Sequence, residues 1–283
     1  MNLLQETKYI MDKYDVHPNK RLGQNFLFDE NALNQIAENV TKEDTIIEIG
    51  PGLGTLTKYL LEKAGKVLCI ELDKKMIEIL EDRFEEYSNF EIINDDVLKV
   101  DLNKIIKENK ENEKIKNVKI VANLPYYITT PIIMKLLEEK LDIESITVMI
   151  QKEVADRLIE IPSGKNTGAI TYTIYYYCDS EKIMEVPNSS FIPEPEVTSE
   201  VIKMKIRKEP VVKVENPKVM FMIIKSAFMQ RRKTLLNALT NAQVFISKQE
   251  GIKILNKLGL NENVRAENLT IENYADLAKE ISK

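Results

Sequence analysis

The sequence predicts a doubly wound α/β fold with a mostly parallel sheet, followed by a small all-α C-terminal domain. Two observations support this fold class. Short apolar runs alternate with segments of helical periodicity, which is the order that βαβ units produce. Four of these runs also end in glycine or polar residues, and the carboxyl ends of parallel strands line the edge of the sheet where ligands bind.

The individual elements follow from residue patterns taken in chain order. β-rich runs predict strands at residues 45–49, 66–72, 90–93, 118–122 and 145–150, and residues 181–187 and 197–206 predict an antiparallel pair. A helix is expected at residues 55–63, and another at 73–87, where Asp73 can cap the first turn. The charged link at residues 103–117 predicts a solvated surface helix. From Pro217 onward the patterns are helical.

Charge is distributed unevenly along the chain, which divides near Pro210 into an expected larger domain at residues 1–208 and a helical domain at residues 209–283. The formal net charge is −5. From Val211 onward there are 12 Lys and Arg residues against 7 Asp and Glu residues, whereas residues 1–210 hold 28 against 38. An acidic body with a basic tail points to a nucleic-acid partner, although an uneven but solvated surface would give the same counts.

Composition excludes several classes of protein. Hydrophobic residues make up 43% of the chain, and no apolar run reaches the roughly 18–20 residues that a membrane span needs. The N-terminal segment is too charged for a secretory signal, so we expect a cytoplasmic protein with no membrane partner. Cys69 and Cys178 are expected to be buried, reduced thiols. Because His17 is the single histidine, a Ser-His-Asp triad or a histidine metal site is disfavoured, and no metal is expected.

The glycine-rich turn at residues 50–54 (GPGLG) follows a strand and opens a helix. The dinucleotide fingerprint G-x-G-x-x-G is not met, because Thr55 stands where its third glycine would be. Residues 48–54 instead match E-x-G-x-G-x-G, a pattern typical of enzymes that bind S-adenosylmethionine (SAM). The predicted fold is therefore the Rossmann-like fold of SAM-dependent methyltransferases. NAD binding, or a turn with no ligand, is the alternative.

Four residues after these strands have the chemistry to hold SAM. Gly50 and Gly52 let the backbone approach a ligand closely, since glycine tolerates a positive φ and has no side chain. Glu71 ends the second strand, where an acidic residue accepts hydrogen bonds from both ribose hydroxyls of an adenosine. Asp96, or its neighbour Asp95, is placed to bind the adenine amino group.

The tetrapeptide NLPY at residues 123–126 ends the fourth strand, where the methyl group of SAM would point. The exocyclic amine of a base is a poor nucleophile because its lone pair is delocalised into the ring. The Asn123 side-chain oxygen and the Leu124 carbonyl could accept its two N–H groups and favour a pyramidal nitrogen. Pro125 would fix the turn, and the Tyr126 ring could stack on a base taken out of its helix. An ordinary Asn-Pro turn is the alternative for the tetrapeptide alone.

The chain resembles the bacterial small-subunit (16S) ribosomal RNA adenine N6-dimethyltransferases. Nearly the whole chain shows the resemblance, through KRLGQNFLFDE, IEIGPGLGTLT, CIELD, NDDVL, ANLPYYITTPI, MIQKEVADRL, VPNSSFIPEPEVTSEVI and RRKTLLNAL. The resemblance implies a seven-stranded, mostly parallel sheet and a helical C-terminal domain. It also implies SAM-dependent transfer of two methyl groups to the N6 atom of each of two adjacent adenines. These adenines lie in a hairpin loop near the 3′ end of 16S rRNA.

The family's functional residues map onto this sequence by motif. SAM contacts are expected from Asn25, Leu27, Gly50, Glu71, Asp96 and Asn123, and contacts with the target adenine from Asn123, Leu124, Tyr126 and Phe191. Apart from this mapping, the basic tail domain predicts RNA contacts at Arg231, Arg232 and Lys233, although these residues could instead only solvate the start of a helix. Phe191 would stack on the face of the base opposite Tyr126. One departure is Glu196, where the family often has lysine, and it puts any phosphate contact there in doubt.

Three other functions share parts of these patterns. A large-subunit rRNA adenine methyltransferase of the macrolide-resistance type has the SAM turn and a similar N-[IL]-P-[YF] motif. A noncatalytic assembly or transcription factor would use the same fold, and a DNA adenine methyltransferase would need a recognition insertion. We expect a monomeric enzyme of ribosome biogenesis. Its partner would be 16S rRNA within the small subunit or its precursor, and its product S-adenosylhomocysteine.

Overall fold

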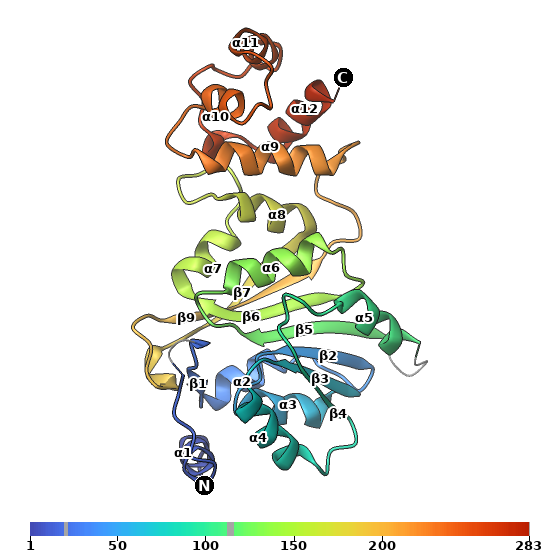
Figure 1. Cartoon of the computed structure of the whole chain (residues 1–283), viewed down its shortest axis with the longest axis vertical. Helices are drawn as coiled ribbons and strands as arrows, with labels where there is room; N and C mark the ends of the chain where they lie inside the picture. Colours follow the sequence, from blue (N-terminus) through green and yellow to red (C-terminus); the bar gives the residue numbers. More distant parts are fainter. Residues whose placement is uncertain (20–21, 112–115, 283) are drawn as a thin grey trace. The chain divides into compact units, whose positions relative to one another are not determined.

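The structure is a computed structural model that describes residues 1–19, 22–111 and 116–282. The chain forms two compact units (Figure 1). The first comprises Met1–Ala155 and Ser180–Ile206, and the second comprises Asp156–Asp179 and Arg207–Lys283. A segment from the middle of the sequence therefore belongs to the same unit as the C-terminal helices.

The first unit contains the strands and the helices that cover them. In chain order its elements are α1 (Leu3–Lys13), β1 (Phe26–Leu27), α2 (Glu30–Ile36), β2 (Asp44–Ile49), α3 (Thr55–Lys63), β3 (Lys66–Glu71), α4 (Lys74–Phe84), β4 (Phe90–Asn94), α5 (Leu102–Lys110), β5 (Asn117–Asn123), α6 (Thr129–Glu138), β6 (Ser145–Gln151), α7 (Lys152–Leu158), β7 (Cys178–Val186), η2 (Asn188–Ser190), β8 (Phe191–Ile192) and β9 (Ser199–Ile206). Helix α7 and strand β7 each cross a junction between the two units.

Seven strands form the main sheet in the order β4-β3-β2-β5-β6-β9-β7. The five strands from β4 to β6 are parallel, and β9 pairs antiparallel with β6. The prediction of a seven-stranded, mostly parallel sheet is confirmed. The parallel order also brings the carboxyl ends of β2, β3, β4 and β5 to one edge of the sheet.

The main sheet is buried on both faces, as a parallel sheet with helices on each side requires. In β2, Ile46 and Ile47 point to opposite faces, and each is fully buried. Ile46 packs with Cys69 of β3 in a core that also receives side chains from α2, α3 and α4. Figure 1 shows α3 and α4 on one side of this sheet and α6 on the other.

The predicted strands of the main sheet are confirmed to within a few residues, and the helix predicted at 55–63 is α3. The helix predicted at 73–87 is α4, which ends earlier than expected, and the Asp73 side chain caps it by accepting from the Lys75 nitrogen. The charged link predicted at 103–117 contributes α5, while its residues 112–115 lie outside the described part of the chain. Both cysteines are buried and free, as expected.

A second, two-stranded sheet joins distant parts of the sequence. Strands β1 and β8 pair antiparallel, with Phe26 opposite Ile192 and Leu27 opposite Phe191. The Phe28 nitrogen then donates to the Ser190 carbonyl at 3.0 Å, which extends the pairing by one hydrogen bond. This small sheet fixes the QNFL segment against the segment that contains Phe191.

The second unit is helical. Its elements are α8 (Ala169–Tyr177), α9 (Pro217–Met229), α10 (Leu235–Asn241), α11 (Lys248–Lys257), η3 (Ala266–Asn268) and α12 (Ile271–Ile281). Tyr172 of α8 lies at the centre of its core, where its hydroxyl donates to the Leu269 carbonyl at 2.6 Å. Its ring makes an edge-to-face contact with Tyr274 of α12 at a centroid distance of 5.0 Å. Aromatic packing therefore ties α8 to the C-terminal helices.

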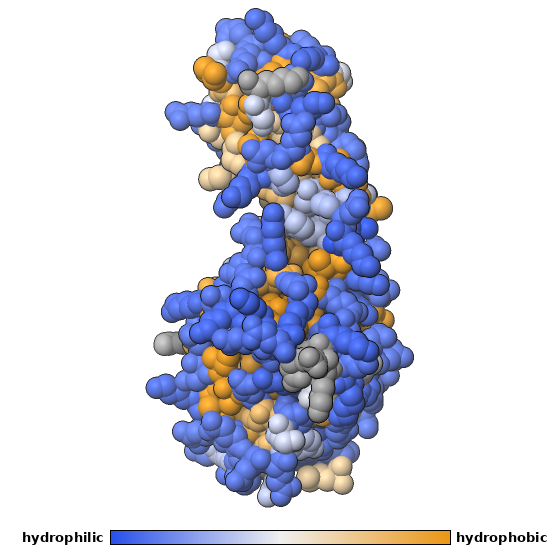
Figure 2. Space-filling model, turned by 90° about the vertical axis from the view of Figure 1, so that its right-hand side faces the viewer, coloured by the Kyte–Doolittle hydropathy of each residue, from blue (hydrophilic) through white to orange (hydrophobic). Residues whose placement is uncertain are grey.

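The surface is mostly hydrophilic on the face that Figure 2 shows, with apolar side chains gathered in small patches. Within the described residues, no helix combines the length and the apolar character that crossing a membrane would require.

Candidate functional site

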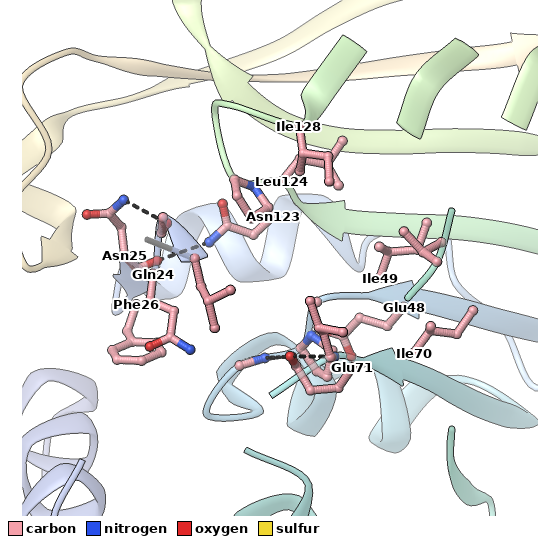
Figure 3. A pocket seen from close by; sticks show the side chains of 18 of the residues that line it. Gln24, Asn25, Phe26, Glu48, Ile49, Ile70, Glu71, Asn123, Leu124 and Ile128 are labelled. Atoms are coloured by element: carbon pink, nitrogen blue, oxygen red, sulfur yellow. Dashed lines mark hydrogen bonds between the residues drawn. The ribbon is translucent and has the colours of Figure 1, made fainter. Parts of the chain in front are cut away.

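A pocket opens at the carboxyl edge of the main sheet (Figure 3). The residues expected to bind the cofactor or the target base all line it: Asn25, Leu27, Gly50, Gly52, Glu71, Asp96, Asn123, Leu124, Tyr126 and Phe191. They come from the ends of β2, β3 and β5, from the segments after β4 and β5, and from the small sheet of β1 and β8. The topology therefore brings together ten residues that are dispersed over most of the first unit.

Two of the three glycines in the turn after β2 have different roles. Gly54 has a φ of 79°, and a Cβ there would lie 2.6 Å from both Leu80 and Phe84, so packing requires a glycine. Gly50 has a φ of 68°, and a Cβ there would meet nothing within 4 Å. The backbone at Gly50 therefore borders open space in the pocket, as close approach by a ligand requires.

Glu71 is held at the end of β3 by backbone N–H groups. Its Oε1 accepts from the nitrogens of Leu72 at 2.8 Å and Asp73 at 2.9 Å, and its Oε2 accepts from Gly52 at 3.2 Å. Burial raises the pKa of Glu71, and these hydrogen bonds offset only part of that effect. The carboxylate is thus fixed against the glycine turn, with lone pairs left to accept from hydroxyl groups of a ligand.

Asp95 and Asp96 follow β4, and both line the pocket. Asp95 is exposed, and its Oδ1 accepts from the Asp96 nitrogen at 2.7 Å. Asp96 is half-buried, and its Oδ1 accepts from the Leu98 nitrogen at 3.0 Å. The two side chains therefore differ in burial, and Asp96 is the one held within the turn.

The segment before β1 orients the Asn123 amide at the end of β5. The Asn123 side-chain nitrogen donates to the Asn25 carbonyl at 3.3 Å, as Figure 3 shows. Gln24 ties the same segment to the turn after β3, because its Nε2 donates to Asp73 Oδ2 at 2.9 Å. No group in the described residues donates to Asn123 Oδ1. The protein thus uses the nitrogen end of the amide and leaves its oxygen end for a ligand.

The NLPY turn packs against the segment that precedes β1. A Cβ on Gly23 would lie 3.1 Å from the Pro125 Cβ and 3.4 Å from the Tyr127 ring, so the two chain segments are in close contact. The Leu124 nitrogen donates to the Met149 carbonyl at 3.1 Å, which continues the pairing of β5 with β6. The turn after β5 is therefore fixed on two sides.

Two aromatic residues from different parts of the first unit line the pocket. Tyr126 is half-buried, and its hydroxyl lies 3.0 Å from the Ser199 hydroxyl at the start of β9. Phe191 of β8 is 3% exposed and belongs to the core that also contains Leu27. Both rings line the cavity that Asn123 enters.

Sequence reasoning missed the contribution of Glu48, which lines the pocket at 2% exposure. The Cys69 thiol donates to its Oε2 at 3.5 Å, a weak hydrogen bond. Burial raises the pKa of Glu48 to about 7, with a smaller contribution from the charge of Glu71. The signal was present as the first residue of the E-x-G-x-G-x-G pattern, but its degree of burial could not be read from spacing.

The expected RNA-binding residues Arg231, Arg232 and Lys233 lie in the second unit, in the turn between α9 and α10. All three are exposed. Arg231 donates a hydrogen bond to the Lys165 carbonyl of the same unit. The structure thus groups these three basic residues in one turn, outside the pocket.

In chemical terms, the pocket combines a backbone cradle, a fixed carboxylate and an oriented amide oxygen. Within residues 1–19, 22–111 and 116–282, no cluster of three or more His, Cys, Asp or Glu side chains is placed to hold a metal ion. The groups present accept hydrogen bonds and stack on planar rings. Such a site suits a reaction that depends on positioning and polar preorganisation.

Comparison with known proteins gives one consistent result. The family model described as ribosomal RNA adenine dimethylase matches residues 16–283. The ribosomal RNA small subunit methyltransferase A of Alkaliphilus metalliredigens is 48% identical over 279 residues, with 98% of this chain and 96% of that protein covered.

Two solved structures share this fold over 91% of the chain. A dimethyladenosine transferase from Plasmodium falciparum matches with a TM-score of 0.75 and 26% identity, covering 91% of this chain and 97% of that chain. The 23S rRNA methyltransferase ErmE matches with a TM-score of 0.65 and 21% identity, covering 91% of this chain and 100% of that chain. At that identity, the second likeness shows the fold alone.

Proposed function

The chain belongs to the ribosomal RNA adenine dimethylase family, and on that premise we propose that it dimethylates two adjacent adenines in a hairpin loop near the 3′ end of 16S rRNA. The protein is a SAM-dependent rRNA adenine dimethyltransferase. The ribosomal RNA small subunit methyltransferase A of Alkaliphilus metalliredigens is 48% identical to this chain over 98% of its length, which favours the small subunit as substrate.

SAM fits the pocket, and it supplies an electrophilic methyl group when bound. The open space beside Gly50 leaves room for a ligand against the backbone, which a side chain there would fill. Glu71 would accept hydrogen bonds from the ribose hydroxyls, and Asp96 would accept one from the adenine amino group. Asn25 and Leu27 would contact the cofactor from the segment at β1, and Gly52 from the glycine turn.

Asn123 and Leu124 would activate the target amine. An exocyclic amine with two hydrogen-bond acceptors on its N–H groups becomes pyramidal more easily, so its lone pair is more nucleophilic. Asn123 Oδ1 is available for this role because Asn25 already receives the amide nitrogen. The Leu124 carbonyl would be the second acceptor. Neither group has to change protonation state, which fits a pocket without histidine.

Tyr126 and Phe191 would hold the target adenine between their rings. An enzyme that modifies a base inside a hairpin has to take that base out of its stack. Stacking on aromatic side chains offsets this cost by about 1–3 kcal/mol per base. The two rings line the same cavity as Asn123, which supports their assignment to the base rather than to the core alone.

The domain at residues 209–283 would position the ribosomal particle, while the domain at residues 1–208 performs the chemistry. Exposed basic side chains at residues 231–233 suit contacts with rRNA phosphates. Because the chain is acidic overall, with a net charge of −5, the small subunit or its precursor is a better substrate than naked RNA. We assign the protein to the cytoplasm, where that particle is built, and expect it to act as a monomer.

The oriented Asn123 amide is the observation that supports this function most directly. The test is to incubate the protein and SAM with small subunits that lack these methyl groups, and to map the products by mass spectrometry. We expect N6,N6-dimethyladenosine at two adjacent positions. Transfer to the large subunit alone, or no transfer, would contradict the proposal.

The role of the basic turn needs its own variants. Reversing the charges of Arg231, Arg232 and Lys233 to glutamate should lower activity on small subunits at least 10-fold and reduce its salt dependence, because phosphate contacts are lost. SAM affinity should stay at the wild-type value. A matched triple variant places glutamate at three exposed lysines elsewhere in the same unit, on helices α11 and α12: Lys248, Lys253 and Lys279. Equal losses in both triple variants would show that net charge, rather than this turn, determines the effect.

A further inference from the structure

We propose that Ser199 is a positioning residue of the site, whose hydroxyl fixes the angle of the Tyr126 ring against the target base. The inference rests on the proposed function, because it takes Tyr126 as the ring that stacks on the adenine. Ser199 does not touch the base in this account. It acts through Tyr126.

The contact joins residues that are 73 positions apart in the sequence. The hydroxyl oxygens of Tyr126 and Ser199 lie 3.0 Å apart, within the range of a good hydrogen bond. Ser199 is 1% exposed, so little water can compete for its hydroxyl. Burial also raises the pKa of Tyr126, so its hydroxyl stays protonated and can donate at neutral pH.

Strand β9 makes Ser199 a stiff anchor. Ser199 faces Gln151 in the antiparallel register of β9 and β6. The Lys152 nitrogen donates to the Thr198 carbonyl at 3.0 Å, immediately before Ser199. On the other side, Glu200 is buried and accepts from Lys152 Nζ at 3.2 Å. The backbone around the serine is therefore fixed by pairing and by both neighbours.

Tyr127 shows what a tyrosine on this turn looks like without such an anchor. It is the next residue along the chain, and it is 60% exposed although it lines the same pocket. The turn alone therefore does not hold a tyrosine ring inside the site. Of these two neighbouring rings, the half-buried one is the ring whose hydroxyl contacts Ser199.

Fixing the ring has a consequence for the reaction. A stacked base follows the tilt of the ring beneath it, and a small tilt moves the N6 atom away from Asn123 Oδ1. Methyl transfer requires the reacting atoms within about 3–3.5 Å in good alignment. Loss of the hydroxyl contact should therefore slow the transfer step and leave the binding of SAM unchanged.

A double-mutant cycle tests the inference. The variants are Tyr126→Phe, Ser199→Ala and the double variant, with Tyr9→Phe as the control, because Tyr9 is exposed on α1 and does not line the pocket. Single-turnover methyl transfer to unmodified small subunits is measured at saturating SAM, together with SAM affinity by calorimetry and the melting temperature. Tyr126→Phe removes the contact from the other side, so the test does not depend on the stability of Ser199→Ala.

Each single variant should transfer methyl groups about 3- to 10-fold more slowly, the usual effect of one hydrogen bond. The double variant should be no slower than either single variant, because all three lack the same contact. Tyr9→Phe should keep the wild-type rate. A wild-type rate for Tyr126→Phe, or losses that multiply in the double variant, would overturn the inference. A wild-type protein that methylates no small subunit would instead refute the proposed function, so the wild-type arm separates the two failures.

Discussion

Strand β2 holds a buried carboxyl group near each end, and the two groups have different partners. At the start of β2, Asp44 is fully buried and accepts hydrogen bonds from Lys119 Nζ at 2.8 Å and from the Thr41 nitrogen at 2.7 Å. Near the carboxyl end, Glu48 is almost as buried, and the Cys69 thiol donates a long hydrogen bond to it at 3.5 Å. Within the described residues, no lysine or arginine pairs with Glu48.

The pKa directions follow from these partners. Burial acts to raise the pKa of Asp44, but the bonds from Lys119, Thr41 and Asn117 outweigh it and hold that pKa below its usual value. Burial raises the pKa of Glu48 to about 7, and nothing of similar size opposes it. At neutral pH, a carboxyl group whose pKa is lowered by folding adds to the stability of the fold, whereas one whose pKa is raised subtracts from it. Groups of the second kind, facing a cavity, are typical of functional sites.

The largest effect on stability is expected at the start of β2, where Asp44 pairs with Lys119. Asp44→Ala leaves the mostly buried Lys119 with the longer contact to Glu144, at 3.9 Å, as its remaining carboxylate partner, so the free energy of unfolding should fall by about 3 kcal/mol. Glu43→Ala is the matched control, since Glu43 pairs with Lys116 on the surface and should cost at most about 1 kcal/mol. Urea unfolding measures both. Equal losses would remove the distinction between a buried and a surface pair at this end.

Near the carboxyl end of β2, where Glu48 lines the pocket, Glu48→Gln should change the pH dependence of stability. Wild-type Glu48 binds a proton in the folded state up to a pH of about 7, whereas its ordinary pKa is 4.5. Stability of the wild type therefore falls as pH rises from 4.5 to about 7, by about 3 kcal/mol in total. Glutamine has no such loss, so the variant should gain this amount relative to the wild type across that window. Urea unfolding from pH 4.5 to 8 tests it, and a difference that is independent of pH would contradict it.

A smaller effect is expected at Glu71. Glu71→Ala removes the acceptor that the ribose hydroxyls would use, and SAM binding should weaken by about 1–3 kcal/mol. Calorimetry measures the affinity, and the melting temperature shows that the variant is folded. Glu91→Ala serves as the control, because Glu91 pairs with Lys66 on β3 away from the pocket. Wild-type affinity in folded Glu71→Ala would show that the carboxylate supports only the glycine turn.

Much of the first unit was predictable because its signals are local. Apolar runs bounded by glycine or polar residues located the strands of the parallel sheet, and parallel topology then required Glu71 and Asn123 to meet at one edge. The glycine turn and NLPY needed no tertiary information to be found. Which end of the Asn123 amide faces the pocket did require the structure, because the Asn25 carbonyl decides it.

Other features depend on contacts that no local pattern encodes. Helix α8 has the sequence AITYTIYYY, whose β-branched and aromatic residues favour a strand, yet it forms a helix because Tyr172 and Tyr176 pack in the core of the second unit. The pairing of β1 with β8 joins two-residue strands, too short for any periodicity. The hydrogen bond between Tyr126 and Ser199 likewise joins residues that no local sequence pattern connects.

The two asparagines at the ends of β5 provide the most direct test of the central claim. Asn117 starts the strand, where its Nδ2 donates to Asp44 Oδ1 at 3.2 Å, and Asn123 ends it in the pocket. Each is changed to alanine, and single-turnover methyl transfer to unmodified small subunits is measured at saturating SAM. Asn123→Ala should be slower by about 100-fold or more, the effect of deleting one preorganised hydrogen-bond partner, and Asn117→Ala should keep the wild-type rate while losing about 1 kcal/mol of stability. Transfer by Asn123→Ala at the wild-type rate would show that its amide oxygen does not activate the amine.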